Sequence, residues 1–104
     1  MLDTTLTALA DPTRRAILAR LAAGEARVTD VAAPFPISLN SVSKHIRMLE
    51  RADLVRRRVQ GRDHYLTLNP KPLDEAADWI ERHRRLWTAT LDRLDAVLQE
   101  DDHG

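Results

Sequence analysis

The chain contains no cysteine, so it can form no disulfide and can hold no metal through a thiolate ligand. It also has no apolar run that approaches the length of a membrane-spanning helix. Its first residues lack the basic start and apolar block of a secretory signal, which predicts a cytoplasmic protein with no membrane attachment. A nucleophile motif, a glycine-rich phosphate loop and a metal-ligand triad are all missing, and this argues against an enzyme.

The net charge is zero, but the charges are distributed unevenly. Residues 1–43 are balanced, residues 44–70 carry seven Lys and Arg against three Asp and Glu, and residues 71–104 carry five against nine. The middle segment is therefore at +4 and the last segment at −4. A local excess of cations is typical of a phosphate-binding surface, although a charged helix face is often simply solvated.

A length of 104 residues, 43% of them hydrophobic, predicts one small globular domain spanning residues 1–104. Leucine spacing predicts a first helix over residues 2–9. Asp11 followed by Pro12 is typical of a helix start, and Gly24 should stop this second helix. Its core face should hold Ala16, Ile17 and Leu21, with Leu18 left open.

A short third helix is expected near residue 30, with Thr29 or Asp30 as its N-cap. The prolines at 34 and 36 should end it, because neither can lie inside a helix.

Residues 37–52 predict the helix around which the chain is organised. Four apolar residues recur in steps of three and four and predict its buried face: Leu39, Val42, Ile46 and Leu49. Ser38 can cap this helix, which should run over about residues 38–52. The opposite face, over residues 40–47, carries short polar side chains and cations and no carboxylate, as expected of a surface that meets base edges and phosphates. A plain helical bundle would not explain the missing carboxylates.

Residues 54–68 predict a basic two-stranded antiparallel ribbon that turns at Gly61. Valine and arginine should occupy opposite faces of its first strand: Val55 and Val59 on one, Arg56 and Arg58 on the other. Arg57 would share the valine face, so twist or fraying must release it. A groove-reading helix beside a charged hairpin indicates a winged helix-turn-helix, a mainly α fold with five helices and a small β wing.

The last helix should cover about residues 72–100. Its seam follows alternating steps of four and three, with Arg84 as the one defect: Leu73, Ala77, Ile80, Arg84, Trp87, Leu91, Leu94 and Leu98. Further apolar residues widen the stripe beyond what one small domain can cover, which predicts a second copy as partner rather than two plain core tryptophans. Such a pair would present two reading helices roughly 34 Å apart to a palindromic operator.

Two segments resemble the ArsR/SmtB-type winged-helix transcriptional repressors: LADPTRRAILARLAAGE at 9–25 and ISLNSVSKHIRMLERADLVRRRVQGRDHYLTL at 37–68. The motif S-x-x-x-V-S-K-H-I-x-x-L-E-x-A-x-L-V and the glycine-arginine wing with its tyrosine carry this resemblance, which extends over about residues 5–98. The pattern WIERHRRLW at 79–87 is similar to a branch that lacks the usual metal sites. The resemblance implies a homodimer, joined by the first and last helices, that binds operator DNA and represses transcription without a cofactor.

The resemblance also implies roles for individual residues. On the reading helix it assigns DNA contacts to Ser38, Asn40, Ser41, Ser43, Lys44, His45 and Arg47. On the wing it assigns them to Arg56, Arg58, Gly61 and Arg62. It assigns the dimer interface to Leu2, Leu6, Trp79, Ile80, Leu86, Trp87, Leu91 and Leu94.

The chain departs from the family's pattern at two places, and two alternative functions remain open. Asp53 stands where the family usually has glycine, and Pro34 and Pro36 lie in the turn between helices. A metal-responsive repressor would need Asp and His ligands from the last helix and the tail, where His83 and His103 have no close partner on one face. A winged helix that binds only proteins would need apolar or acidic anchors, which residues 40–47 lack.

Overall fold

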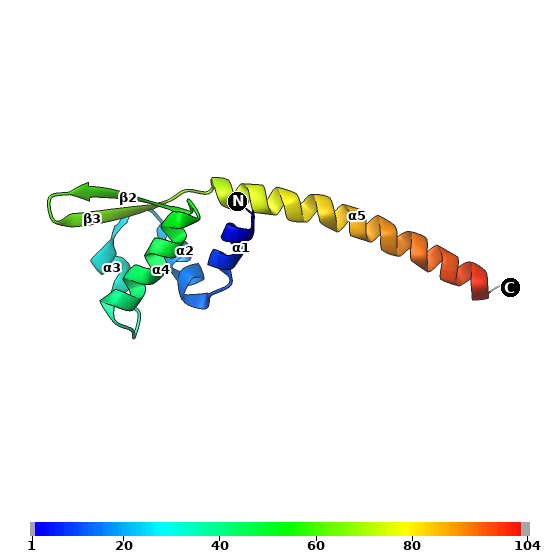
Figure 1. The fold of residues 1–104 in the computed structure, drawn as a ribbon, viewed down its shortest axis with the longest axis horizontal. Coiled ribbons are helices and arrows are strands. Elements are labelled where there is room, and N and C mark those ends of the chain that lie inside the picture. Colours follow the sequence, from blue (N-terminus) through cyan, green and yellow to red (C-terminus); the bar gives the residue numbers. More distant parts are fainter. Residues whose placement is uncertain (1, 103–104) are drawn as a thin grey trace.

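The computed structural model describes residues 2–102, the last two by their backbone alone. Eight elements follow one another along the chain (Figure 1): α1 Leu2–Leu9, α2 Pro12–Ala22, β1 Ala26–Arg27, α3 Val28–Ala32, α4 Leu39–Arg51, β2 Val55–Gln60, β3 Asp63–Leu68 and α5 Lys71–Asp102. The predicted fold class, five helices with a small β wing, is confirmed.

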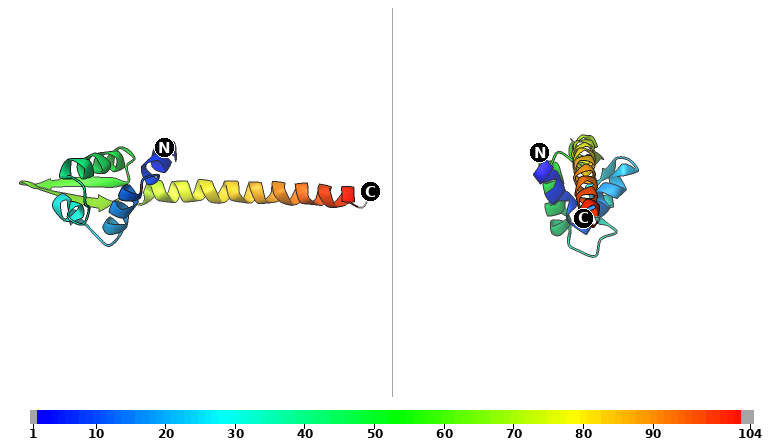
Figure 2. Two further views of the ribbon diagram at one scale, coloured as in Figure 1. Left: turned by 90° about the horizontal axis from the view of Figure 1, so that it is seen from below. Right: turned by 90° about the vertical axis from the view of Figure 1, so that its right-hand side faces the viewer.

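The molecule consists of a small body and one long projecting helix. Helices α1 to α4 and the sheet form the body, and α5 extends away from it as a rod, so that the extents are 75 × 26 × 21 Å. Figure 2 shows that only the beginning of α5 lies beside α1. No helix within residues 2–102 combines the length and apolar character needed to cross a membrane.

The predicted start of α2 is confirmed. The Asp11 carboxylate accepts a 2.9 Å hydrogen bond from the backbone N–H of Arg14, and Pro12 occupies the first turn. This backbone N–H lowers the pKa of Asp11 below its usual value, because it stabilises the ionised carboxylate. Gly24 follows the helix with φ +139°, where glycine is the least strained residue.

Two details of the first three helices differ from the prediction. Ala16, expected on the core face of α2, is exposed, whereas Ile17 and Leu21 are buried there as expected, together with Leu18. Helix α3 begins at Val28 and no side chain caps it, so the expected cap by Thr29 or Asp30 is wrong. The chain enters α3 directly from β1, which fixes its start without an N-cap side chain.

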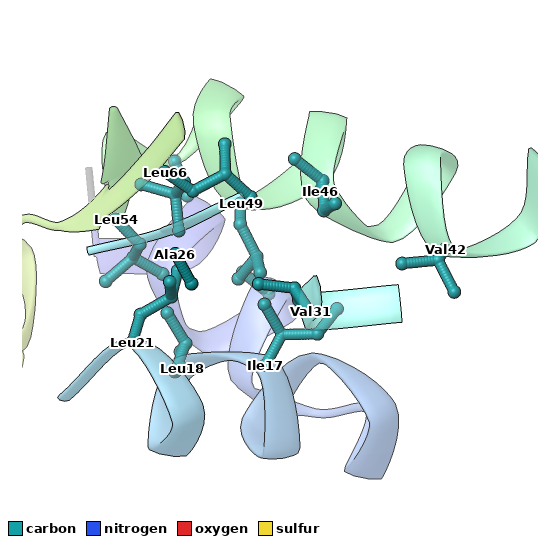
Figure 3. Close-up of a cluster of buried hydrophobic side chains, with 13 residues drawn as sticks. Ile17, Leu18, Leu21, Ala26, Val31, Val42, Ile46, Leu49, Leu54 and Leu66 are labelled. Carbon is teal, nitrogen blue, oxygen red and sulfur yellow. The ribbon is translucent and has the colours of Figure 1, made fainter. Parts of the chain in front are cut away.

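The core lies where α2, α3 and α4 meet the sheet (Figure 3). Its fully buried large side chains come from these elements and, for Leu54, from the link between α4 and β2: Ile17, Val31, Val42, Ile46, Leu49, Leu54, Val55 and Leu66. Leu39, expected on this face, is 54% exposed. It is the first residue of α4 and lies at the free end of the helix, and Val42 is the first residue of the seam that is buried.

The sheet has three strands in the order β1-β3-β2, where two were predicted. The added strand pairs Ala26 with Leu66 and Arg27 with Tyr65. The predicted hairpin is confirmed, with β2 and β3 in register from Val55–Leu68 to Gln60–Asp63 and Gly61 at φ +62° in the turn. In Figure 1 the far end of this hairpin extends past the helices, and Val59 is accordingly 57% exposed.

Candidate nucleic-acid interface

The reading helix α4 starts at a serine cap. Ser38 accepts a 3.1 Å hydrogen bond from the backbone N–H of Ser41, and its hydroxyl donates to the Ser41 hydroxyl at 3.0 Å. Both serines were predicted to contact DNA, and both also define where the helix begins. Because the cap sets the first turn, it sets the direction of the polar face that follows.

Three exposed side chains form the free part of that face. Asn40, Lys44 and Arg47 lie four and three residues apart, so they project from one side of α4. None of them hydrogen-bonds or ion-pairs with another part of residues 2–102. Ser43, also a predicted contact, is half-buried. The unpaired amide, ammonium and guanidinium groups are therefore available to a ligand.

His45 is held differently from these three. Its Nδ1 lies 3.2 Å from Nη1 of Arg14 and 3.7 Å from Oδ2 of Asp11, and its side chain is 23% exposed. Arg14, which sequence reasoning did not single out, is buried beneath it. One ring nitrogen of His45 thus contacts the body of the protein.

The predicted wing arginines differ in how strongly they are held. Arg56 ion-pairs with Asp53 at 3.6 Å. Arg58 donates to Glu25 and to Gln60, each at 2.8 Å, and its guanidinium stacks over the Tyr65 ring at 4.5 Å. The Glu25 carboxylate raises the pKa of Arg58 by hydrogen-bonding its charged form.

Arg62 follows Gly61 at the tip of the hairpin and is exposed. Within the described part of the chain no hydrogen bond or ion pair engages its side chain. It is therefore the wing cation that is most free to meet a phosphate.

We expected twist or fraying to release Arg57 from the valine face of β2. Instead, Arg57 stays there and is held by two partners. It donates to Glu50 at 2.7 and 3.3 Å and to His64 at 2.9 Å. The ion pair joins α4 to the wing, so that the reading helix and the hairpin are held in one orientation. The sequence could not predict this pair. An acidic residue near the end of a helix often has a basic residue seven positions later in a strand without the two being in contact.

Asp53, at the position where the resemblance led us to expect glycine, adopts a left-handed backbone conformation. Its φ is +57°, in the left-handed region where a side chain is strained. The amide Nδ2 of Asn69 donates to the Asp53 carbonyl at 2.7 Å and to its carboxylate at 3.2 Å. These bonds hold the tight link between α4 and β2, and the departure from glycine leaves the turn intact.

No group of three or more His, Cys, Asp or Glu within the described residues is arranged to hold a metal ion. His83 donates from Nδ1 to the Trp79 carbonyl at 2.8 Å and stacks on the Trp79 ring at 3.8 Å between centroids. His103, the other tail ligand considered, lies outside the described residues.

Most of the predicted dimer residues are exposed, and those on α5 form an apolar stripe. Leu2 and Trp79 are half-buried and line a small cavity between α1 and α5. The other six are each between 40% and 63% exposed: Leu6, Ile80, Leu86, Trp87, Leu91 and Leu94. Val97 and Leu98 continue the stripe at 52% and 55% exposed. Figure 2 shows that no other element lies beside α5 beyond its first turns, and its large apolar side chains there are exposed.

Comparison with known proteins places this geometry in context. A family model described as a helix-turn-helix domain matches residues 9–58. The transcriptional repressor SdpR of Bacillus subtilis is 36% identical over 73 residues, which are 70% of this chain and 81% of that protein. The HTH-type transcriptional regulator Rv2034 of Mycobacterium tuberculosis is 39% identical over 84 residues, or 81% of this chain and 76% of that protein.

A solved structure supports the same relationship. The crystal structure of an ArsR family transcriptional regulator is 39% identical and superposes with a TM-score of 0.80, covering 84% of this chain and 96% of the other.

Proposed function

The chain belongs to the ArsR-type winged helix-turn-helix transcriptional regulators, which are not enzymes, and we propose that it is a homodimeric repressor of a palindromic operator. The observation that carries the proposal is the exposed face of α4, where Asn40, Lys44 and Arg47 have no protein partner among residues 2–102 and where residues 40–47 include no carboxylate. A face with unpaired cations binds a polyanion such as DNA well. It suits a protein partner poorly, because charged side chains are depleted in the cores of protein–protein interfaces.

In the proposed complex, α4 enters the major groove, where some of its side chains contact bases and others contact phosphates. Asn40 and Lys44 contact base edges, since an amide matches adenine and an ammonium matches the acceptors of guanine. Arg47, further along the helix, contacts a phosphate, as a delocalised cation does well. The half-buried Ser43 and the cap hydroxyls add short contacts where the backbone of the DNA comes close.

The wing holds the DNA backbone beside the groove. Arg62 reaches a phosphate or the minor groove without breaking any interaction described for the free protein. Arg56 and Arg58 exchange Asp53 and Glu25 for phosphates, an exchange between exposed ion pairs that costs little. Arg57, by contrast, stays on Glu50 and keeps the wing in position.

A second copy of the chain covers the stripe on α5. Monomeric proteins rarely leave large contiguous apolar patches in water, and a parallel or antiparallel copy of the same helix would bury this one. Arg84 does not obstruct that contact, because it is neutralised on its own helix by Glu81 at 2.7 and 3.0 Å. With Arg85 it lowers the pKa of Glu81 to about 2.

The test is to recover genomic DNA fragments that bind the purified protein, with and without added divalent metals. We expect the recovered fragments to share an inverted repeat, and the set to be the same in both conditions. Because the proposed ligand is chromosomal DNA, we expect the protein to act in the cytoplasm. Fragments without a common sequence would contradict a specific repressor, and a set that changes with metal would favour the metal-responsive alternative.

A further inference from the structure

We propose that Arg14 fixes His45 in the tautomer that carries its proton on Nε2, and that this N–H is a donor to the operator. The inference deepens the proposed DNA-binding function and rests on it. It makes His45 a hydrogen-bond donor on the reading helix. It makes Arg14 the residue that orients the imidazole ring of His45.

The Arg14 guanidinium is locked between two helices. Arg14 is only 9% exposed, and its Nε and Nη2 donate to the carbonyls of Ala8 at 2.8 Å and Thr7 at 3.0 Å. These carbonyls belong to the last turn of α1, where a helix leaves acceptors free for other donors, and the Thr7 carbonyl also accepts from the Ala10 N–H at 3.2 Å. The remaining nitrogen, Nη1, faces α4 and contacts His45 Nδ1 at 3.2 Å and the Met48 sulfur at 3.3 Å.

The chemistry of the two groups decides the tautomer. A guanidinium has only donors, so Nδ1 of His45 must be the acceptor of the bond from Arg14. A neutral imidazole carries one proton, which is then on Nε2. The Asp11 carboxylate would favour a proton on Nδ1, but its Oδ2 is 3.7 Å away, beyond the range of a hydrogen bond.

The opposite ring nitrogen is free to act on a ligand. Among the described residues, none hydrogen-bonds to His45 Nε2, and no buried side-chain nitrogen or oxygen is left without a partner. Nε2 must therefore reach solvent, on a helix where half-buried Ser41 lies one turn before His45 and exposed Lys44 directly precedes it. DNA offers acceptors to such a donor in its phosphate oxygens and in the purine N7 and guanine O6 atoms.

Two other histidines give internal references. His64 Nδ1 is 2.9 Å from Nη1 of Arg57, so the same reasoning places its proton on Nε2. His83 Nδ1 is 2.8 Å from the Trp79 carbonyl, which can only accept, so its proton is on Nδ1. The structure thus assigns one tautomer to His45 and His64 and the opposite one to His83.

Long-range ¹H–¹⁵N correlation of the imidazole rings in the full chain, at about pH 8.5 where histidine is neutral, measures these tautomers directly. We expect His45 and His64 as Nε2–H and His83 as Nδ1–H, with the His45 signals identified by their loss in His45→Gln. In Arg14→Lys, which keeps the charge but loses the rigid fork, we expect His45 alone to become a mixture. Wild-type His45 found as Nδ1–H would overturn the proposal, and so would an unchanged His45 in a folded Arg14→Lys.

Matched variants test the donor itself. Glutamine can place an N–H near the position of Nε2, whereas asparagine reaches only the position of Nδ1. On the recovered operator we expect His45→Asn to weaken binding roughly tenfold and His45→Gln by no more than about threefold, the range of one hydrogen bond. A random duplex of equal length shows the source of the acceptor: equal losses on both duplexes indicate a phosphate, and a loss on the operator alone indicates a base.

Equal binding by the two His45 variants would overturn the donor role. A wild-type protein that binds no DNA, with His45 nevertheless as Nε2–H, would overturn the proposed function and the donor role with it, while leaving the Arg14–His45 geometry established. Should Arg14→Lys fail to fold, the wild-type tautomer and the His45 pair still decide the question.

Discussion

The hydroxyl of Ser38 starts the reading helix by accepting a hydrogen bond from the backbone of Ser41, and it also lies on the surface proposed to meet DNA. These two contributions can be separated, because different residues satisfy them. A carboxylate caps a helix as well as a hydroxyl does, but it repels phosphate.

We therefore expect Ser38→Ala to lower the free energy of unfolding by about 1 kcal/mol, and Ser38→Asp to leave it nearly unchanged. On operator DNA, Ser38→Asp should bind more weakly than wild type despite its stability. Urea denaturation and a DNA titration measure the two effects. Equal stability of the alanine and aspartate variants would show that the cap does not support α4.

Among the residues, helix caps could be predicted from local patterns for α2 and α4 but not for α3, whose start follows β1 directly. The caps at Asp11 and Ser38 follow from short patterns, and both are confirmed. Burial of Arg14 could not be predicted, since its reason is the pair of carbonyls that the end of α1 brings to it. Leu39 fits the apolar period but lies one turn before the packed part of α4.

Among the elements, the wing contains four arginines in different electrostatic states. Arg56, Arg57 and Arg58 each ion-pair with a carboxylate, and Arg62 has no partner in the described chain. A cation already neutralised by a neighbour displaces fewer counterions when it meets DNA. The contribution to nonspecific affinity should therefore differ between neighbouring arginines of equal formal charge.

Replacing Arg62 by glutamine should weaken binding to all sequences and reduce the slope of log affinity against log salt by about one for each wing. Arg57→Gln is the matched control, with the same change of charge in the same hairpin. It should alter the slope less and should lower stability instead, because it releases Glu50 and His64. A change in sequence preference alone on replacing Arg62 would contradict the phosphate assignment.

The hairpin itself could be predicted from its alternation and its glycine, but the third strand could not. β1 has only two residues, Ala26 and Arg27, which are too few to form a pattern. Its pairing with β3 depends on how α2 and α3 bring distant segments together. The orientation of Arg57 depends likewise on Glu50, which approaches only after α4 and β2 pack.

The whole molecule separates a basic reading region from an acidic projecting helix, at +4 over residues 44–70 and −4 over residues 71–104. The body of one chain presents a single reading helix, and the distance to a second one depends on the contact between two copies. We propose that α5 sets this distance, because the helix extends far beyond the body (Figures 1 and 2) and carries exposed apolar side chains along that length. The stripe was predictable from periodicity, whereas the contacts that would cover it depend on a second chain.

Leu91→Glu should break the pair, because it places a carboxylate in the centre of the stripe, where Leu91 is 63% exposed in one chain. Ala89→Glu adds the same charge two residues away on the other side of the helix and serves as the control. Sedimentation at micromolar concentration should give a species near 11.8 kDa for Leu91→Glu and twice that mass for wild type and Ala89→Glu. A wild-type protein found only at 11.8 kDa would contradict the dimer.

The most direct test of the account is a hydroxyl-radical footprint of the wild-type protein on a recovered operator fragment. A dimer that reads with α4 and sets its spacing with α5 predicts two protected patches, related by the two-fold symmetry of the inverted repeat and centred about one duplex turn, or roughly 34 Å, apart. A single protected patch, or protection that ignores the repeat, would contradict it.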